Sequence, residues 1–151
     1  MIDELCYDYG YYRPRTYREN ARRDYLNLAK CKKRTAKKIR KAIKQQLQYV
    51  RRDFGYVEFL LSEGAELSEK RRQRYEVLWQ LYEQQKYMYE NNVHSVPDRI
   101  VSISQPYVRP IVRGKAAAPV EFGAKLDLSI DECSMARLEK LSFDAYNESG
   151  V

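Results

Sequence analysis

The apolar residues in the first part of the chain recur at intervals of three and four positions, which is the spacing of one face of an α-helix. The longest series consists of Ala36, Ile39, Ala42, Ile43, Leu47, Val50, Phe54 and Val57. We predict that this helix runs to about Glu63 and ends at Gly64, because glycine readily adopts the left-handed conformation of a helix terminus. Gly55 lies inside the series and costs about 1 kcal/mol relative to alanine. The pattern therefore leaves open a bend or a break at Gly55.

A second series of apolar side chains follows Ser68, a residue type that caps helix N-termini well. It comprises Tyr75, Leu78, Trp79, Tyr82 and Tyr89 and ends at Asn91 and Asn92. The loop between the two series holds about four or five residues, which predicts an antiparallel helical hairpin. We expect Trp79 to anchor the seam between the two helices. A coiled-coil dimer is the alternative, although the apolar pattern is not a strict heptad.

Two shorter helices are predicted before this hairpin. The first is a short acidic and apolar piece that ends at Gly10, and since no N-cap precedes it, we interpret it as the tail of a longer helix. Thr16 and Glu19 have the spacing of a capping box, in which each side chain satisfies a free backbone N–H. A second helix is therefore expected from about Tyr17 to Ala29.

The period of the pattern changes to two after His94. The β-branched residues Ile100, Val101 and Ile103 are followed by Pro106 and Pro110, which hold an extended segment, and residues 114–119 are expected to form a mobile loop. Apolar and polar residues then alternate over 120–130, which predicts one continuous strand. A turn at 131–134 leads to an antiparallel return strand at 135–143.

The predicted fold class is therefore α+β, with a long helical hairpin followed by a β-hairpin. We divide the chain into a helical region at residues 1–93 and a β-rich region at residues 94–151. The length of 151 residues suits one domain of ordinary size.

Charge adds a candidate partner to this picture. The formal net charge is +7, and the segment between Lys30 and Arg52 carries eleven cations without one acid. Such a segment favours a polyanion, and we predict contacts to nucleic-acid phosphates without sequence preference. The predicted binding residues here are Lys32, Lys33, Arg34, Lys37, Lys38, Arg40, Lys41 and Lys44. A solvated outer face is the alternative interpretation of the same charges.

The fourteen tyrosines admit two interpretations, half-buried core rings or faces on which an exposed base stacks. Cys6, Cys31 and Cys133 lack the spacing of a zinc site, and His94 is the one histidine. Such thiols fit a reducing cytoplasm, and no apolar run reaches the length of a membrane span. We therefore expect a cytoplasmic protein that does not contact a membrane.

The aspartates of the β-rich region are candidates for two-metal phosphoryl transfer, which needs two or three converging carboxylates. They are Asp98, Asp127, Asp131 and Asp144. Ordinary surface acids explain all four, and no glycine-rich phosphate loop or Ser/His/Asp spacing accompanies them.

Two runs of the sequence resemble a known family. HSVPDRIVSISQPYVRPIVRGKAAAPVEFGAKLDLSIDE with LEKLSFDAYNESGV, and YRPRTYRENARRDYLNLAKCKKRTAKKIRKAIKQQLQYVRRD, look like parts of bacterial insertion-sequence transposases with an RNase H-like DDE catalytic domain. The resemblance covers nearly the whole chain. It implies DNA transposition, in which two aspartates and a glutamate hold two Mg²⁺ ions for strand transfer.

The same resemblance implies that all three catalytic acids fall outside residues 1–151, so no catalytic or metal-binding residue and no cofactor is expected in this chain. Asp98 with Arg99, and the strand carrying Lys125 and Asp131, match the family. There they frame the sheet beside the active site, which suggests that Lys125 lies near DNA phosphate. The chain would then be a truncated transposase, an incomplete RNase H-like domain with its helical insertion.

Three hypotheses follow from the sequence. The chain is an inactive transposase fragment with residual DNA affinity, a self-sufficient DNA- or RNA-binding module that regulates the intact element, or a dimerisation element. Self-association is expected through exposed strand edges or the helical hairpin, because unpaired edges accept further strands.

Overall fold

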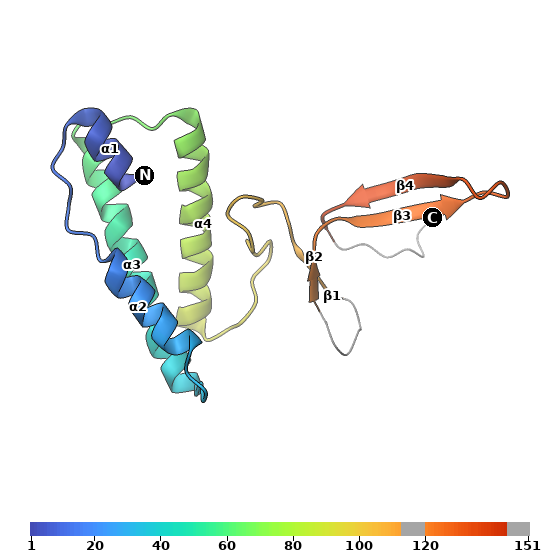
Figure 1. The fold of residues 1–151 in the computed structure, drawn as a ribbon, viewed down its shortest axis with the longest axis horizontal. Coiled ribbons are helices and arrows are strands. Elements are labelled where there is room, and N and C mark those ends of the chain that lie inside the picture. Colours follow the sequence, from blue (N-terminus) through green and yellow to red (C-terminus); the bar gives the residue numbers. More distant parts are fainter. Residues whose placement is uncertain (113–119, 145–151) are drawn as a thin grey trace. The chain divides into compact units, whose positions relative to one another are not determined.

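The computed structural model describes residues 1–112 and 120–144, and it divides the chain into two compact units, Met1–His94 and Ser95–Val151. The described helices all lie in the first unit and the described strands in the second (Figure 1). This arrangement confirms the α+β class. The predicted mobile loop at 114–119 falls wholly outside the described residues, as does the chain end after Asp144.

The two long helices are α3, Ala36–Ser62, and α4, Glu69–Asn91, and they form the predicted helical hairpin (Figure 1). Thr35 caps α3 by accepting a hydrogen bond from the Lys38 amide. The helix therefore begins later than the basic segment, and the cations at 32–34 lie in the connection before it rather than on the helix. Gly64 follows α3 with a φ of 98°, as expected for a terminating glycine, and α3 is continuous through Gly55.

Aromatic rings form the seam between α3 and α4. Phe54 is 7% exposed and makes edge contacts with Tyr75, Trp79 and Tyr82 at centroid distances of 5.4, 4.9 and 5.6 Å. Trp79 is 38% exposed, so it lies at the rim of the seam. Trp79 therefore takes part in the seam as expected, through contacts with Phe54, Tyr75 and Tyr82, but Phe54 is the buried ring at its centre.

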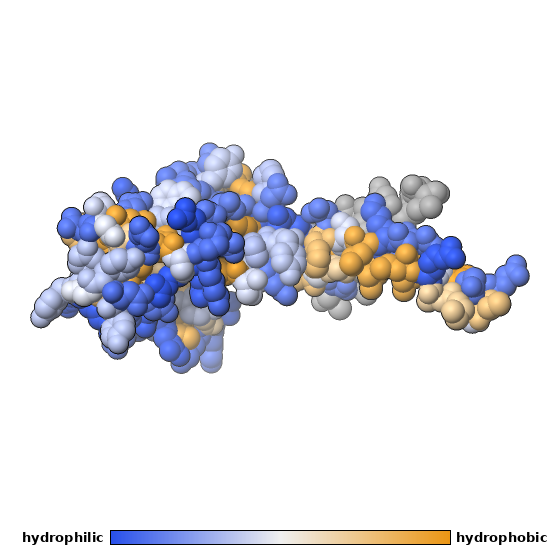
Figure 2. Space-filling model, turned by 90° about the horizontal axis from the view of Figure 1, so that it is seen from above, coloured by the Kyte–Doolittle hydropathy of each residue, from blue (hydrophilic) through white to orange (hydrophobic). Residues whose placement is uncertain are grey.

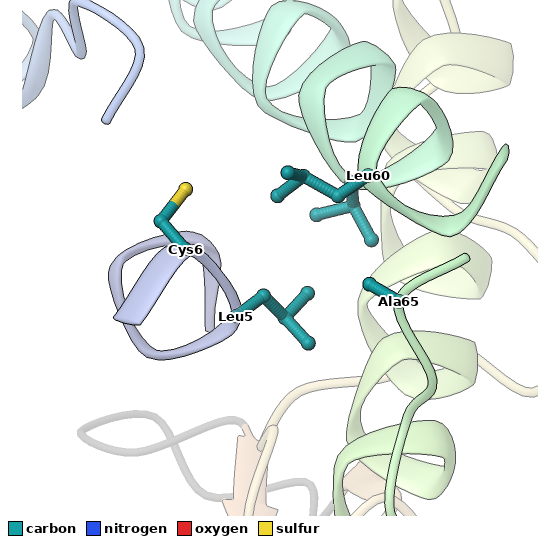
Figure 3. Close-up of a cluster of buried hydrophobic side chains, with 5 residues drawn as sticks. Leu5, Cys6, Leu60 and Ala65 are labelled. Carbon is teal, nitrogen blue, oxygen red and sulfur yellow. The ribbon is translucent and has the colours of Figure 1, made fainter. Parts of the chain in front are cut away.

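Helix α1, Ile2–Tyr9, packs against the C-terminal half of α3 through a small core. Leu5 and Cys6 are buried there with Val57, Leu60 and Ala65, as Figure 3 shows for four of them. The predicted stop at Gly10 is confirmed, since its φ is 70° and its backbone N–H donates to the Cys6 carbonyl.

Helix α2, Arg18–Ala29, lies along the N-terminal half of α3. The Gln46 side chain donates to the Ala21 carbonyl at 3.0 Å, and the Tyr49 hydroxyl donates to Asp24 at 2.9 Å. The capping box was wrong. Tyr17 occupies the N-cap position, and no side chain caps the helix.

The second unit contains two antiparallel hairpins. Strands β1, Pro110–Val112, and β2, Val120–Phe122, form the first, and β3, Lys125–Ile130, and β4, Ala136–Ser142, form the second. The continuous strand expected over 120–130 is therefore two strands. Gly123, with a φ of 144°, interrupts it in a conformation that side chains rarely allow. The predicted turn and return strand are confirmed.

Alternation in β3 and β4 places apolar residues on one face of the second hairpin. Cross-strand pairing sets Leu126 opposite Leu141 and Leu128 opposite Leu138. We call the apolar strip the residues Leu126, Leu128, Ile130, Leu138 and Leu141, each at least 53% exposed. Figure 2 shows apolar residues at the surface of this unit.

Candidate nucleic-acid interface

The cations of α3 gather on the face opposite the seam. Because each helical residue turns the chain by about 100°, Lys37, Lys41 and Lys44 share a direction that returns at Arg51 and Arg52. We call these five residues the cationic stripe. All five are exposed. None takes part in an ion pair within residues 1–112 and 120–144.

Two of the predicted binding residues instead contact the ends of helices. The Arg34 guanidinium donates to the carbonyls of Ala29 and Cys31 at 3.2 and 3.3 Å, where α2 ends. Arg40 donates to the Tyr89 carbonyl at 2.9 Å and lies 4.3 Å from the Tyr89 ring centroid, at the end of α4. Cations are favourable at helix C-termini, so both arginines have a structural role beside any phosphate contact.

The remaining predicted residues are distributed over three places. Lys32 and Lys33 are exposed in the connection between α2 and α3, and the Lys38 ammonium lies 3.7 Å from the Cys31 sulfur. Lys125 is half-buried on β3 in the second unit. The structure thus groups Lys37, Lys41 and Lys44 on one helix face and does not bring Lys125 into the same unit.

An open groove that the sequence analysis missed lies at the C-terminal end of the cationic stripe. Its volume is about 680 Å³, and half of its lining residues are aromatic: Tyr11, Tyr12, Pro14, Arg52, Gly55, Tyr56, Phe59 and Leu60. We call it the aromatic groove. The signal for this groove in the sequence was Phe59. It follows Gly55 by four residues and lies on the polar face of α3, away from the apolar series.

Two arginines, Arg52 from the groove and Arg15, lie against the ring of Tyr17 next to this groove. The Arg52 and Arg15 guanidinium carbons lie 4.1 and 5.7 Å from the Tyr17 ring centroid. The segment 13–20 borders a second, polar depression that shares Pro14 with the groove. There Arg13 and Arg18 both pair with Asp3, at 3.6 and 3.5 Å, so two cations meet one carboxylate.

One carboxylate in the helical unit has a perturbed pKa. Partial desolvation raises the pKa of Asp53 above its usual 3.8 although the residue is exposed to solvent, and the charges of Arg52 and Arg18 oppose that shift. Asp53 lines a cavity of about 380 Å³ beside the apolar side chains of Val50 and Phe54, which disfavours its charged form.

The aspartates of the β-rich region do not converge. Asp98 pairs with Arg109 at 3.7 Å, Asp127 lies opposite Lys140, and the Asp131 carboxylate accepts the amides of residues 133 and 135 in the turn. In the described part of the chain, no group of three or more His, Cys, Asp or Glu side chains is arranged to hold a metal ion.

Comparisons with known proteins gave no match, whether to family models, to curated proteins or to solved structures. Among residues 1–112 and 120–144, no helix has the length and apolar character needed to cross a membrane.

Proposed function

We propose that this protein binds nucleic acid through phosphate contacts along the cationic stripe. The observation that carries the proposal is the position of Lys37, Lys41 and Lys44 on one exposed helix face, without acidic partners among the described residues. A solvated face would gain from interspersed acids, which reduce repulsion between like charges four residues apart. A phosphate backbone supplies those missing negative charges and releases its counterions on binding.

We further propose that the chain corresponds to an internal part of a DDE transposase that lacks the catalytic acids. The support is the sequence resemblance over nearly the whole chain, and the β3–β4 hairpin would then belong to an RNase H-like sheet. Mg²⁺ would be a cofactor of the full-length family and not of this chain. The free thiols of Cys6, Cys31 and Cys133 are compatible with a reducing cytoplasm.

The salt dependence of affinity tests the binding proposal. Because each neutralised phosphate of a duplex contributes a slope of about −0.9 to log K against log salt, the wild-type protein should lose affinity steeply between low and moderate salt. Fluorescence anisotropy with a labelled duplex measures it. An affinity that does not change with salt would exclude phosphate contacts as the basis of binding.

Strand cleavage tests the transposase proposal. The purified chain should neither cut nor join DNA with Mg²⁺ present. Mg²⁺-dependent cleavage that disappears in Asp127→Asn or Asp131→Asn would contradict the proposed absence of the catalytic acids.

A self-sufficient binding module is the second candidate. It is favoured by the helical unit, which has its own buried core around Leu5 and Leu60 and its own aromatic seam around Phe54. A regulator of this kind would unfold in one cooperative thermal transition. It would bind nucleic acid and would not cleave the strands. Unfolding without cooperativity would argue against it.

A further inference from the structure

The aromatic groove continues the cationic stripe along the same face of α3. The direction shared by Lys37, Lys41 and Lys44 returns at Gly55 and Phe59, so one ligand strand lying along this face would reach both features. The distance from Lys37 to Phe59 along the axis is about 33 Å at 1.5 Å per residue. The groove and the stripe can therefore contact a single extended ligand.

The groove exposes aromatic rings that no other part of the described chain covers. Phe59 is 58% exposed and Tyr12 is 100% exposed. Tyr11, in contrast, is held in place, since its hydroxyl donates to the Glu63 carbonyl and its ring stacks on Tyr9 at 6.4 Å. One wall is thus fixed before any ligand binds, which lowers the entropy lost on binding.

Gly55 keeps the groove open. A glycine inside a helix costs about 1 kcal/mol relative to alanine, and no heavy atom lies within 4 Å of where a Cβ would stand at Gly55. Close packing against a neighbour therefore does not explain the glycine. Its consequence is a bare stretch of helix backbone between Arg52, Tyr56 and Phe59, which line the groove with it.

Charge indicates what kind of ligand enters. Arg52 lines the groove, and Arg13 and Arg15 line the depression next to it. An apolar aromatic slot with cations at its rim fits a flat ring attached to phosphates. Stacking on aromatic side chains combined with backbone contacts to cations is how proteins bind single-stranded nucleic acid.

We infer that the aromatic groove binds an unpaired nucleobase, so that the preferred ligand is single-stranded DNA or RNA. The inference rests on the proposed function and specifies its ligand class. Duplex bases are already stacked on their neighbours and offer only their edges, whereas an unpaired base has a free face for Phe59. The stripe supplies phosphate contacts to either ligand, and the groove adds affinity only for a single strand.

The test compares oligonucleotides of about 12 nucleotides by fluorescence anisotropy with the complete chain: single-stranded DNA, the same sequence as RNA, an abasic DNA strand and the DNA duplex. We expect the intact single strands to bind more tightly than the abasic strand. Phe59→Ala should weaken single-strand binding at least about five-fold and leave duplex and abasic binding within two-fold. The DNA and RNA arms show which sugar the protein prefers.

A second variant and a control keep the test independent of folding. Gly55→Leu places a side chain in the groove without a close neighbour and should also weaken single-strand binding, while the thermal unfolding temperature does not fall. Tyr25→Ala removes a ring that is 61% exposed on α2 and does not line the groove. It should therefore change neither the single-strand affinity nor the duplex affinity.

Equal affinity for intact and abasic strands, with no effect of Phe59→Ala, would overturn the groove inference even if a steep salt dependence upheld phosphate binding. In that case an apolar side chain of a protein partner would be the better occupant. Absence of binding to all four ligands would overturn both proposals together.

Discussion

At the scale of single residues, the buried side chains of α1 decide whether that short helix stays attached. An eight-residue helix is marginal by itself in water, so its stability comes from packing. Leu5 is 0% exposed and lies among Val57, Leu60 and Ala65. Its periodicity within α1 could not reveal this burial, because the partners are more than fifty positions away in the sequence.

Leu5→Ala should lower the free energy of unfolding by about 2–5 kcal/mol, because it removes buried methyl groups and leaves a cavity. Denaturant unfolding followed by circular dichroism measures the change. Ile39→Ala is the control, since Ile39 belongs to the apolar series of α3 but is 37% exposed, and it should cost less. Equal losses would contradict the position of the core.

We expect Asp53 to make the stability of the helical unit depend on pH. Its pKa is raised by partial desolvation in the fold, so the folded chain binds this proton more tightly than the unfolded chain. Stability contributed by the protonated form is therefore present below the usual pKa of about 3.8 and is lost as the pH rises through the raised pKa.

Asp53→Asn should thus raise the thermal unfolding temperature at pH 7 and make no difference at pH 3, where the carboxyl is already neutral. Thermal unfolding at both pH values measures this. A variant that is less stable than wild type at pH 7 would show that the charged carboxylate stabilises the fold.

At the scale of elements, the sequence pattern predicts the described helices closely, because helix ends carry local signals. The stop at Gly10, the end of α3 near Gly64 and the end of α4 at Asn91 all follow from the residue types there. The start of α3 was less clear, since Lys32 and Lys33 continue the basic run without an apolar position to mark the boundary.

The strands were harder to predict, because alternation alone does not distinguish a strand from two strands joined at a glycine. Gly123 fits the alternating period over 120–130, yet its backbone conformation divides this segment into β2 and β3. The aromatic groove was missed for a related reason. Its walls come from residues 11–14 and 52–60, and only the fold brings these segments together.

Replacing either of two glycines in the helical unit with alanine should change the free energy of unfolding in opposite directions. Gly55→Ala should raise the free energy of unfolding by up to about 1 kcal/mol, because alanine is the better helix residue and the space around it is open. Gly10→Ala should lower it by about 1 kcal/mol or more, because Gly10 has a φ of 70°, which a Cβ disfavours. Chemical denaturation measures both, and effects of the same sign would contradict this account of the helices.

At the scale of the whole molecule, we expect association through the apolar strip of the β3–β4 hairpin, whose five residues are each at least 53% exposed. In the described part of the chain, β3 and β4 pair with each other and no third strand joins them. A two-stranded hairpin is marginal in water. A second copy of the chain offers an identical apolar strip and identical open edges, which makes a two-fold symmetric contact self-complementary.

Sedimentation velocity over a concentration series should therefore detect dimers or larger species. Leu128→Lys, which puts a charge on the apolar strip, should shift the distribution toward monomer. Ser129→Lys adds the same charge on the opposite face of β3 and should leave it unchanged. A wild-type protein that is monomeric at every concentration would contradict this prediction.

Binding of nucleic acid through the cationic stripe is the central proposal for the molecule as a whole. Its most direct test is the salt slope of nucleic-acid affinity in two variants that lose the same charge. Lys37→Gln, Lys41→Gln and Lys44→Gln together neutralise the three lysines of the five-residue stripe, and Lys70→Gln, Arg72→Gln and Arg74→Gln neutralise three exposed cations of α4.

For a duplex, the stripe variant should lower the magnitude of the slope of log K against log salt by about 2 to 3, since each lost phosphate contact contributes about 0.9. The α4 variant should keep nearly the wild-type slope. Equal reductions in both variants would mean that net charge alone governs affinity, and an unchanged slope in the stripe variant would mean that α3 is not the binding face.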